Sequence, residues 1–169
     1  MIDAILEEIS LGLPDAREFW RVTLRLALAM VLGGVVGFQR EWAGKPAGVR
    51  THMLVALGAA VFVIGPMEFS MLSGDLSRVI QGLVTGIGFI GAGAILKREE
   101  KGEIEGLTTA AGIWMTAAMG LAVGLGRFGL ALISVFFAWF VLAVIKRTEQ
   151  WLNRDLVKDR KKIVVDDRD

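Results

Sequence analysis

The sequence predicts an all-α, polytopic membrane protein of one domain with about five transmembrane helices. Two observations lead to this fold class. Of the 169 residues, 54% are hydrophobic, and the charged residues, 22% of the chain, lie in short stretches between long uncharged runs. Because the hydrocarbon core of a bilayer is about 30 Å thick, a helix needs about 20 mostly apolar residues to cross it. The runs, uncharged apart from one histidine, occupy residues 26–39, 51–67, 79–96, 106–126 and 128–145.

Local signals refine the ends of these helices. Asp15–Glu18 has the spacing of a capping box ahead of the first span. Thr51 is a candidate N-cap of the second span, which Pro66 should kink or end. Residues 73–75, Ser-Gly-Asp, should form a short turn before the third. The expected membrane domain covers residues 1–146, with spans at about 20–39, 51–70, 79–97, 108–125 and 128–146.

The two ends of the chain lie outside these spans, and the basic residues predict their orientation. Apolar residues at positions 2, 5, 6 and 9 predict a short amphipathic helix on the membrane surface. Residues 147–169 form a charged tail. With five spans, 14 basic residues fall on the side of the C-terminus and 4 on the side of the N-terminus. The positive-inside rule therefore places the N-terminus outside and the C-terminus in the cytoplasm.

Small residues at helical spacing predict close packing between helices, because lipid provides no hydrophobic drive for helix association. The third span carries a stripe of glycines beside polar residues, for which a pore lining is the second interpretation. Some of the small-residue surface should remain for a partner, so we expect a homo-oligomer, most simply a two-fold dimer. The alternative is that one compact bundle uses all of it. The candidate packing residues are Gly33, Gly37, Gln81, Gly82, Thr85, Gly86, Gly88, Gly112 and Gly120.

The uncharged runs contain no aspartate or glutamate, and Arg25 and His52 are the ionisable residues in or at the edge of a span. Arg25 should extend towards the outer surface; the alternative is a buried pair with Glu68 or Asp75. Magnesium is bound through carboxylates, water and phosphate oxygens. A membrane interior without carboxylates is therefore a poor magnesium pathway, although backbone carbonyls could supply oxygens. We expect no cofactor and no confident metal site, with magnesium as the alternative.

Polar residues gather at the predicted cytoplasmic ends of the first, second and fourth spans. Two helix N-termini and several cations there favour an anion or an acidic partner segment over a metal ion. We expect Arg40 or Arg50 to pair with Glu41. The alternative interpretation is that these residues are interfacial anchors and caps. The candidate cluster is Gln39, Arg40, Glu41, Arg50, Thr51, His52, Thr108 and Thr109.

Patterns typical of enzymes are absent from the sequence. There is no cysteine, no H-E-x-x-H, no phosphate loop and no protected pair of carboxylates. Residues 86–91 match G-x-G-x-x-G, but they lie inside a membrane span with no preceding strand. We therefore expect a protein without catalytic residues and without a nucleic-acid partner, whose surroundings are the lipid bilayer.

Three motifs in this order resemble the MgtC/SapB family of bacterial inner-membrane proteins, over about residues 26–146. They are GFQREWAGKPAGVRTHMLVALGAAVF, GLVTGIGFIGAGAILK and GLTTAAGIWMTAAMGLAVGLG. The resemblance implies a multi-pass inner-membrane protein linked to magnesium limitation, acid stress and, in some pathogens, virulence. It also implies a membrane ATPase or ATP synthase as a regulated partner of some members. Gln39 stands where the family's G-x-E-R-[EQ] motif commonly has glutamate. Longer members add a soluble ACT-like domain, for which the tail of this chain is too short.

Three classes of function follow from these observations. The first is a non-enzymatic regulator of another membrane protein in adaptation to low magnesium or acid stress. The second is an ion or small-solute transporter or channel, and the third, least favoured, is an enzyme.

Overall fold

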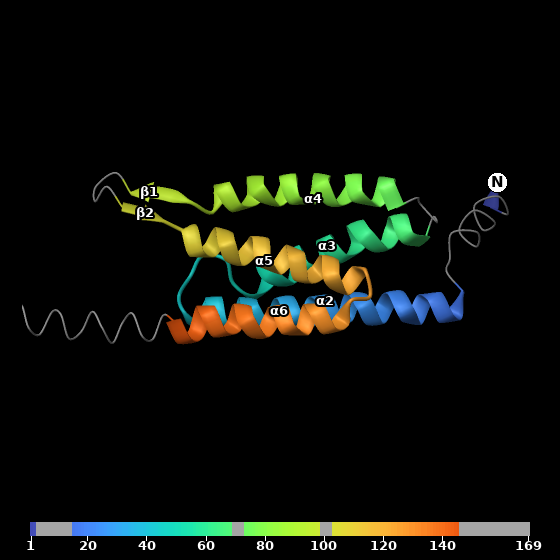
Figure 1. Ribbon diagram of the computed structural model, residues 1–169, viewed down its shortest axis with the longest axis horizontal. Coiled ribbons are helices and arrows are strands. Elements are labelled where there is room, and N and C mark those ends of the chain that lie inside the picture. Colours follow the sequence, from blue (N-terminus) through green and yellow to red (C-terminus); the bar gives the residue numbers. More distant parts are fainter. Residues whose placement is uncertain (3–14, 69–72, 99–102, 146–169) are drawn as a thin grey trace, which may run out of the picture.

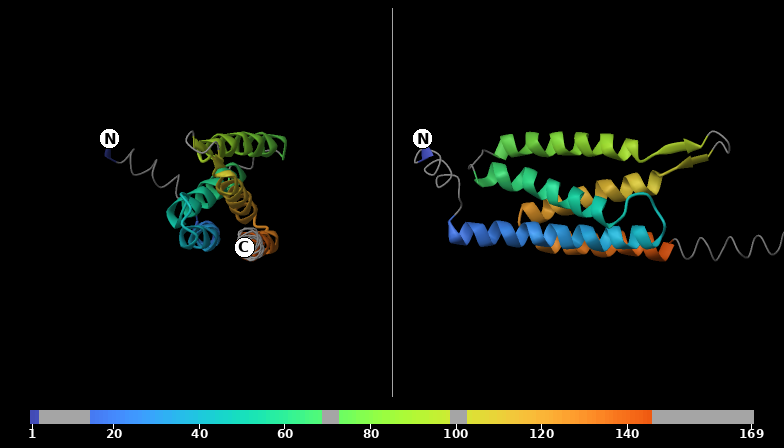
Figure 2. Two further views of the ribbon diagram at one scale, coloured as in Figure 1. Left: turned by 90° about the vertical axis from the view of Figure 1, so that its left-hand side faces the viewer. Right: turned by 180° about the vertical axis from the view of Figure 1, so that it is seen from behind.

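The computed structural model describes residues 1–2, 15–68, 73–98 and 103–145. In this part of the chain five α-helices pack lengthwise into a bundle, with α3 and α5 between α4 on one side and α2 with α6 on the other (Figures 1 and 2). An antiparallel pair of short strands joins α4 to α5, with Leu96 opposite Glu105. In chain order the elements are α2 (Ala16–Trp42), α3 (Val49–Glu68), α4 (Ser73–Gly93), β1 (Leu96–Arg98), β2 (Glu103–Glu105), α5 (Leu107–Gly124), α6 (Phe128–Phe140) and the π-helical turn η1 (Val141–Ile145).

The lengths and compositions of these helices are those of a membrane protein. Helices α2, α3, α4 and α5 are each long and apolar enough to cross a bilayer, and α6 with its continuation is a shorter apolar helix. Large side chains point outward from α6, where Phe136 is 61% exposed and Phe137 is 58% exposed. In water such a surface would be costly, whereas in lipid it is the expected exterior. The chain is therefore an all-α polytopic membrane protein, as the sequence predicts.

Several element boundaries differ from the expected ones, and each difference has a local cause. Asp15 caps α2 as expected, because its Oδ1 accepts the N–H of Glu18 at 2.7 Å. Thr51 lies inside α3, whose first residue, Val49, donates its N–H to Oε2 of Glu41 at 2.9 Å. A carboxylate from the preceding helix thus supplies the cap expected from Thr51. Residues 73–75 form the first turn of α4 instead of a separate turn.

The loop expected between the third and fourth spans is the β1–β2 hairpin in its described part. This hairpin and the loop between α2 and α3 lie at the same end of the bundle, here called the hairpin end, which is the predicted cytoplasmic side (Figure 1). The predicted surface helix over residues 2–9, apart from Ile2, and the tail over residues 147–169 lie outside the described residues.

Close approach between helix backbones defines the core. A Cβ atom on Gly33 of α2 would lie 2.5 Å from the carbonyl oxygen of His52 in α3. On the other side of α3, a Cβ on Gly120 of α5 would collide with the backbone of Ala56. Ala56 is itself fully buried. Three helices therefore meet where only glycine and alanine fit, and α3 is the central one of the three. Gly33, Gly37, Gly120 and Gly124 form this glycine seam.

Helix α4 uses the face opposite to the one expected for contact within the chain. Ile87 is 6% exposed and belongs to a core cluster with Ile113 and Ala117 of α5. The small face points away from the rest of the described chain, since a Cβ on Gly82, Gly86 or Gly88 would have nothing within 4 Å. Aliphatic side chains such as Leu83 and Ile87 make this contact, and these three glycines lie outside it.

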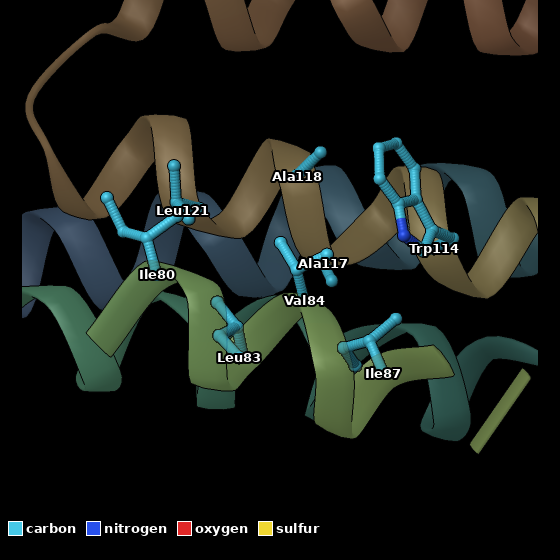
Figure 3. Close-up of a pocket in the computed structure, with 8 residues that line it drawn as sticks. All are labelled: Ile80, Leu83, Val84, Ile87, Trp114, Ala117, Ala118 and Leu121. Atoms are coloured by element: carbon cyan, nitrogen blue, oxygen red, sulfur yellow. The ribbon is translucent and has the colours of Figure 1, made fainter. Parts of the chain in front are cut away.

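The contact between α4 and α5 leaves an apolar groove of about 200 Å³. Figure 3 shows side chains from the two helices facing one another across it. No lining residue carries a charge, so the groove offers apolar contact and no site for chemistry. Its lining residues are Ile80, Leu83, Val84, Ile87, Trp114, Ala117, Ala118 and Leu121.

Candidate functional site

A buried arginine joins the hairpin ends of α2 and α5. Arg40 lies in the last turn of α2 and is only 3% exposed. Its Nη2 donates a hydrogen bond of 2.8 Å to Oγ1 of Thr109, which is 2% exposed and lies in the first turn of α5. The structure thus brings together two residues of the predicted cluster that lie 69 positions apart in the chain.

A second buried polar contact joins α3 to α5 deeper in the bundle. His52 is fully buried, and its Nδ1 lies 2.7 Å from Oγ1 of Thr116. The same hydroxyl donates its proton to the carbonyl oxygen of Gly112 at 2.9 Å. Because a hydroxyl has one proton, Oγ1 must accept from His52, which places a proton on Nδ1. The neutral ring then carries its free lone pair on Nε2.

Gln39 forms a third contact, between α2 and the end of α6. Its Nε2 donates to the carbonyl oxygen of Leu142 at 2.9 Å. Leu142 lies in the π-helical turn η1. An amide provides the N–H that this contact requires. An ionised glutamate, the residue that the resembled motif commonly has here, accepts hydrogen bonds only.

The remaining members of the predicted cluster lie at the surface of the same end. Glu41 caps α3, Arg50 and Thr108 are exposed, and Thr51 is half-buried. Within the described residues neither Arg40 nor Arg50 forms an ion pair with Glu41. The geometry explains this, since Arg40 turns inward to Thr109 while the Glu41 carboxylate bonds to the α3 backbone.

Within the described residues Arg25 forms no ion pair with Glu68 or Asp75, the alternative expected for it. Its Nη1 donates to the carbonyl oxygen of Gly124 at 2.8 Å, so the guanidinium satisfies the last turn of α5. The chain leaves α5 through Gly126, which has φ of +74°, and a Cβ there would lie 3.0 Å from Nη2 of Arg25. Glu68 pairs instead with Arg21, at 2.9 Å. A cation at a helix C-terminus is favourable because it faces the negative end of the helix dipole.

Four buried polar atoms have no hydrogen-bond partner in the described part of the chain. They are Nε of Arg25, Oε1 of Gln39, Nε of Arg40 and Nε2 of His52. Buried polar atoms are nearly always hydrogen-bonded, so each is a place to look for a missing partner. The described residues also contain no group of three or more histidine or acidic side chains placed to hold a metal ion.

Sequence reasoning left two partners of this site out of the predicted cluster. Thr116 lies two turns after Thr109 on the same face of α5, so helical spacing alone could have added it. The carbonyl of Leu142 carried no signal in the sequence, because every residue has such a backbone group.

With this geometry in hand, the family of the chain can be determined. The model of the MgtC family matches residues 26–151. The chain belongs to the MgtC family. The match covers the helices that supply Arg40, His52, Thr109 and Thr116, so the polar contacts lie within the family's own domain.

Three bacterial relatives are similar to this chain. Protein SrpB of Synechococcus elongatus is 43% identical, over 79% of this chain and 80% of the relative. The putative magnesium transporter YhiD of Escherichia coli K12 is 41% identical, over 72% of this chain and 59% of the relative. Protein MgtC of Salmonella typhimurium LT2 is 39% identical, over 78% of this chain and 55% of the relative. This chain thus matches less than two thirds of the last two proteins. No solved structure matches it significantly.

The protonation of His52 can be tested directly, because it is the one histidine in the chain. We expect ¹⁵N NMR of histidine-labelled protein in detergent to show a neutral ring protonated on Nδ1. Thr116→Val removes the acceptor and should perturb this signal, whereas Thr85→Val, at an exposed hydroxyl bonded within α4, should not. A ring protonated on Nε2 in the wild-type protein would contradict the assignment.

The contact of Gln39 with Leu142 predicts an order of stability among variants. Gln39→Met removes the hydrogen bond, which should cost about 1 kcal/mol. Gln39→Glu should cost more at neutral pH, because it places a carboxylate oxygen against a carbonyl oxygen. Thermal unfolding followed by circular dichroism in mild detergent measures both, with Thr23→Val, at an exposed position of the same helix, as the control. If the glutamate variant equals the wild type in stability, Gln39 does not act as a donor.

Proposed function

We propose that this chain is a non-enzymatic regulator of another membrane protein, active in adaptation to low magnesium or acid stress. Membership of the MgtC family and a 39% identical relative named MgtC support the link to this family's physiology. A membrane ATPase, such as ATP synthase, is the partner that the family resemblance suggests. The proposed location is the inner membrane of a bacterium, with the hairpin end in the cytoplasm.

One observation carries this proposal: the buried polar side chains hold helices together and do not line a pathway for a cation. Arg40 and His52 each bond from one helix to α5, and Gln39 bonds to η1. Among the described residues this centre is cationic or neutral, with no carboxylate bonded to it. A magnesium ion needs oxygen ligands that replace the water it gives up reluctantly. An arginine at that position would repel it.

A magnesium-linked transporter or channel is the second candidate. The Escherichia coli relative, 41% identical, carries the name putative magnesium transporter. Glycine-rich membrane helices can also expose backbone carbonyls where their pattern is interrupted. The two candidates differ in whether the purified protein alone moves an ion.

Flux and growth measurements distinguish them. We expect the purified protein in sealed liposomes to show no saturable magnesium uptake, with proton and small-anion fluxes measured in parallel. We also expect alanine variants of Arg40, Glu41, Arg50 and His52 to lose growth in low magnesium in cells whose own copy is deleted. Saturable uptake abolished by substitution of Gln39 or Glu41 would establish the transporter. If growth in low magnesium is unchanged in all four alanine variants, these residues are not required for the function.

We also propose that the small face of α4 contacts a partner helix, most simply in a homodimer. Gln81 and Thr85 are exposed there at membrane depth, beside Gly82 and Gly86, and the face has no neighbour in the described chain. An amide in lipid gains by bonding to a partner, and glycines permit the close approach that such a bond needs. An amide both donates and accepts, so it can pair with its own copy across a two-fold axis.

Matched glycine variants test this interface. Gly82→Leu should leave a folded protein that is monomeric in mild detergent, because the added side chain meets nothing within the chain. Gly120→Leu should unfold the protein, because leucine would overlap the backbone of Ala56. Light scattering after size exclusion measures the mass, and circular dichroism measures the fold. A wild-type monomer, or an unchanged mass after both Gly82→Leu and Gly86→Leu, would contradict the dimer.

A further inference from the structure

The first turn of α5 is a helix N-terminus without a side-chain cap. Gly106 occupies the cap position with φ of +97° and has no side chain to offer. The N–H groups at the start of a helix lack partners within the helix, and together they carry about half a positive charge. No described residue accepts a hydrogen bond from the backbone N–H groups of Leu107, Thr108 and Thr109. These groups can therefore bind an oxyanion. Thr108, in the middle of this turn, is exposed.

A buried cation lies directly beneath this turn. The guanidinium of Arg40 is bonded to Thr109, yet its Nε–H has no partner among the described residues. Within those residues no carboxylate pairs with Arg40. A buried charge without a counter-ion is costly. The last turn of α2 supplies negative potential at Arg40, and the positive end of α5 opposes it.

A second arginine on α2, Arg25, provides an internal comparison. Arg25 meets the opposite, C-terminal end of α5, where the dipole itself supplies negative potential and the Gly124 carbonyl accepts. Arg25 therefore needs no anion. Arg40 and the N–H groups of α5 both require negative charge at the same place, and neither can supply it to the other.

We propose that the first turn of α5 and Arg40 together bind a phosphate group. A planar guanidinium, free backbone N–H groups and a threonine hydroxyl are all donors, and they match the several oxygens of a phosphate. The exposed Thr108 opens the turn to water or to lipid headgroups at the hairpin end. The phosphate comes either from a phospholipid headgroup or from free inorganic phosphate. The site stands apart from the proposed regulatory role, because it would bind phosphate whether or not this chain has a protein partner.

Ligand-dependent thermal stability tests the site, since a ligand that binds the folded state raises the unfolding midpoint. Delipidated protein in a neutral, phosphate-free detergent is titrated with inorganic phosphate, with chloride at matched ionic strength as reference. A second arm adds short-chain phosphatidylglycerol, with a phosphate-free monoacylglycerol of the same chain length as reference. We expect a saturable rise in the midpoint in one arm, and the responding arm identifies the source of the phosphate.

Single substitutions distinguish binding at this site from a general attraction of the anion to the positively charged end of the protein. Arg40→Met should weaken the apparent affinity by about tenfold or more, the value of a charge-assisted hydrogen bond. Lys45→Met, at an exposed cation of the same end, should leave it unchanged. Thr108→Asp should weaken binding, because it places a carboxylate at the exposed position of this turn, where it repels a phosphate. The last variant keeps the test decisive if Arg40→Met fails to fold.

The inference is overturned if neither phosphate nor phosphatidylglycerol shifts the wild-type midpoint beyond its reference. It is also overturned if Lys45→Met weakens the response as much as Arg40→Met. Where Arg40→Met does not fold, an unchanged affinity in Thr108→Asp has the same consequence. Growth in low magnesium plays no part in these outcomes, so failure here is distinguishable from failure of the proposed function.

Discussion

The close approach of α3 to its two neighbours is the constraint on which the rest of the structure depends. Within a membrane, burying apolar side chains between helices gains little, because lipid is equally apolar. The helices can then pack closely only where a residue has no side chain to keep the backbones apart. The glycine seam provides such residues on α2 and α5. Alanines at positions 56 and 60 give α3 a surface that fits on both sides. This proximity brings His52 within bonding distance of Thr116 and allows Arg40 to reach Thr109.

Two arginines of α2 determine how α2 and α5 lie against one another. Arg25 and Arg40 are 15 residues apart, as are their partners Gly124 and Thr109. In antiparallel helices that rise 1.5 Å per residue, both contacts span about 22 Å and form together only in one register. Sliding by one turn would leave both guanidinium groups buried without a partner. The polar contacts in this bundle thus specify the register of α2 against α5, whereas apolar contacts and glycines define that register only loosely.

The sequence predicted the architecture well, because segregation of charge and long apolar runs are strong signals in a membrane protein. The cap at Asp15 also followed from local chemistry. The partners of Arg25 and Arg40 could not be predicted, since they depend on which helices become neighbours. The small face of the third span predicted packing, yet within the chain α4 uses the face of Leu83 and Ile87. Periodicity identifies two faces and does not say which one meets the same chain.

The two arginines of α2 that contact the ends of α5 face opposite ends of its helix dipole, and this difference bears on function. At one end of α5 the cation from α2 satisfies a helix C-terminus. At the other end Arg40 meets the N-terminus of α5, whose positive potential opposes the favourable potential of the last turn of α2 that carries Arg40. Folding alone would favour an uncharged residue at position 40, because replacing a buried charge by an apolar residue of similar size is often stabilising. The guanidinium held at that place aligns α2 with α5 through Thr109 and, in the site proposed above, would also attract a phosphate. The same reasoning argues against a cation passing close to it, since the ion would meet two positive groups with no carboxylate among the described residues to offset them.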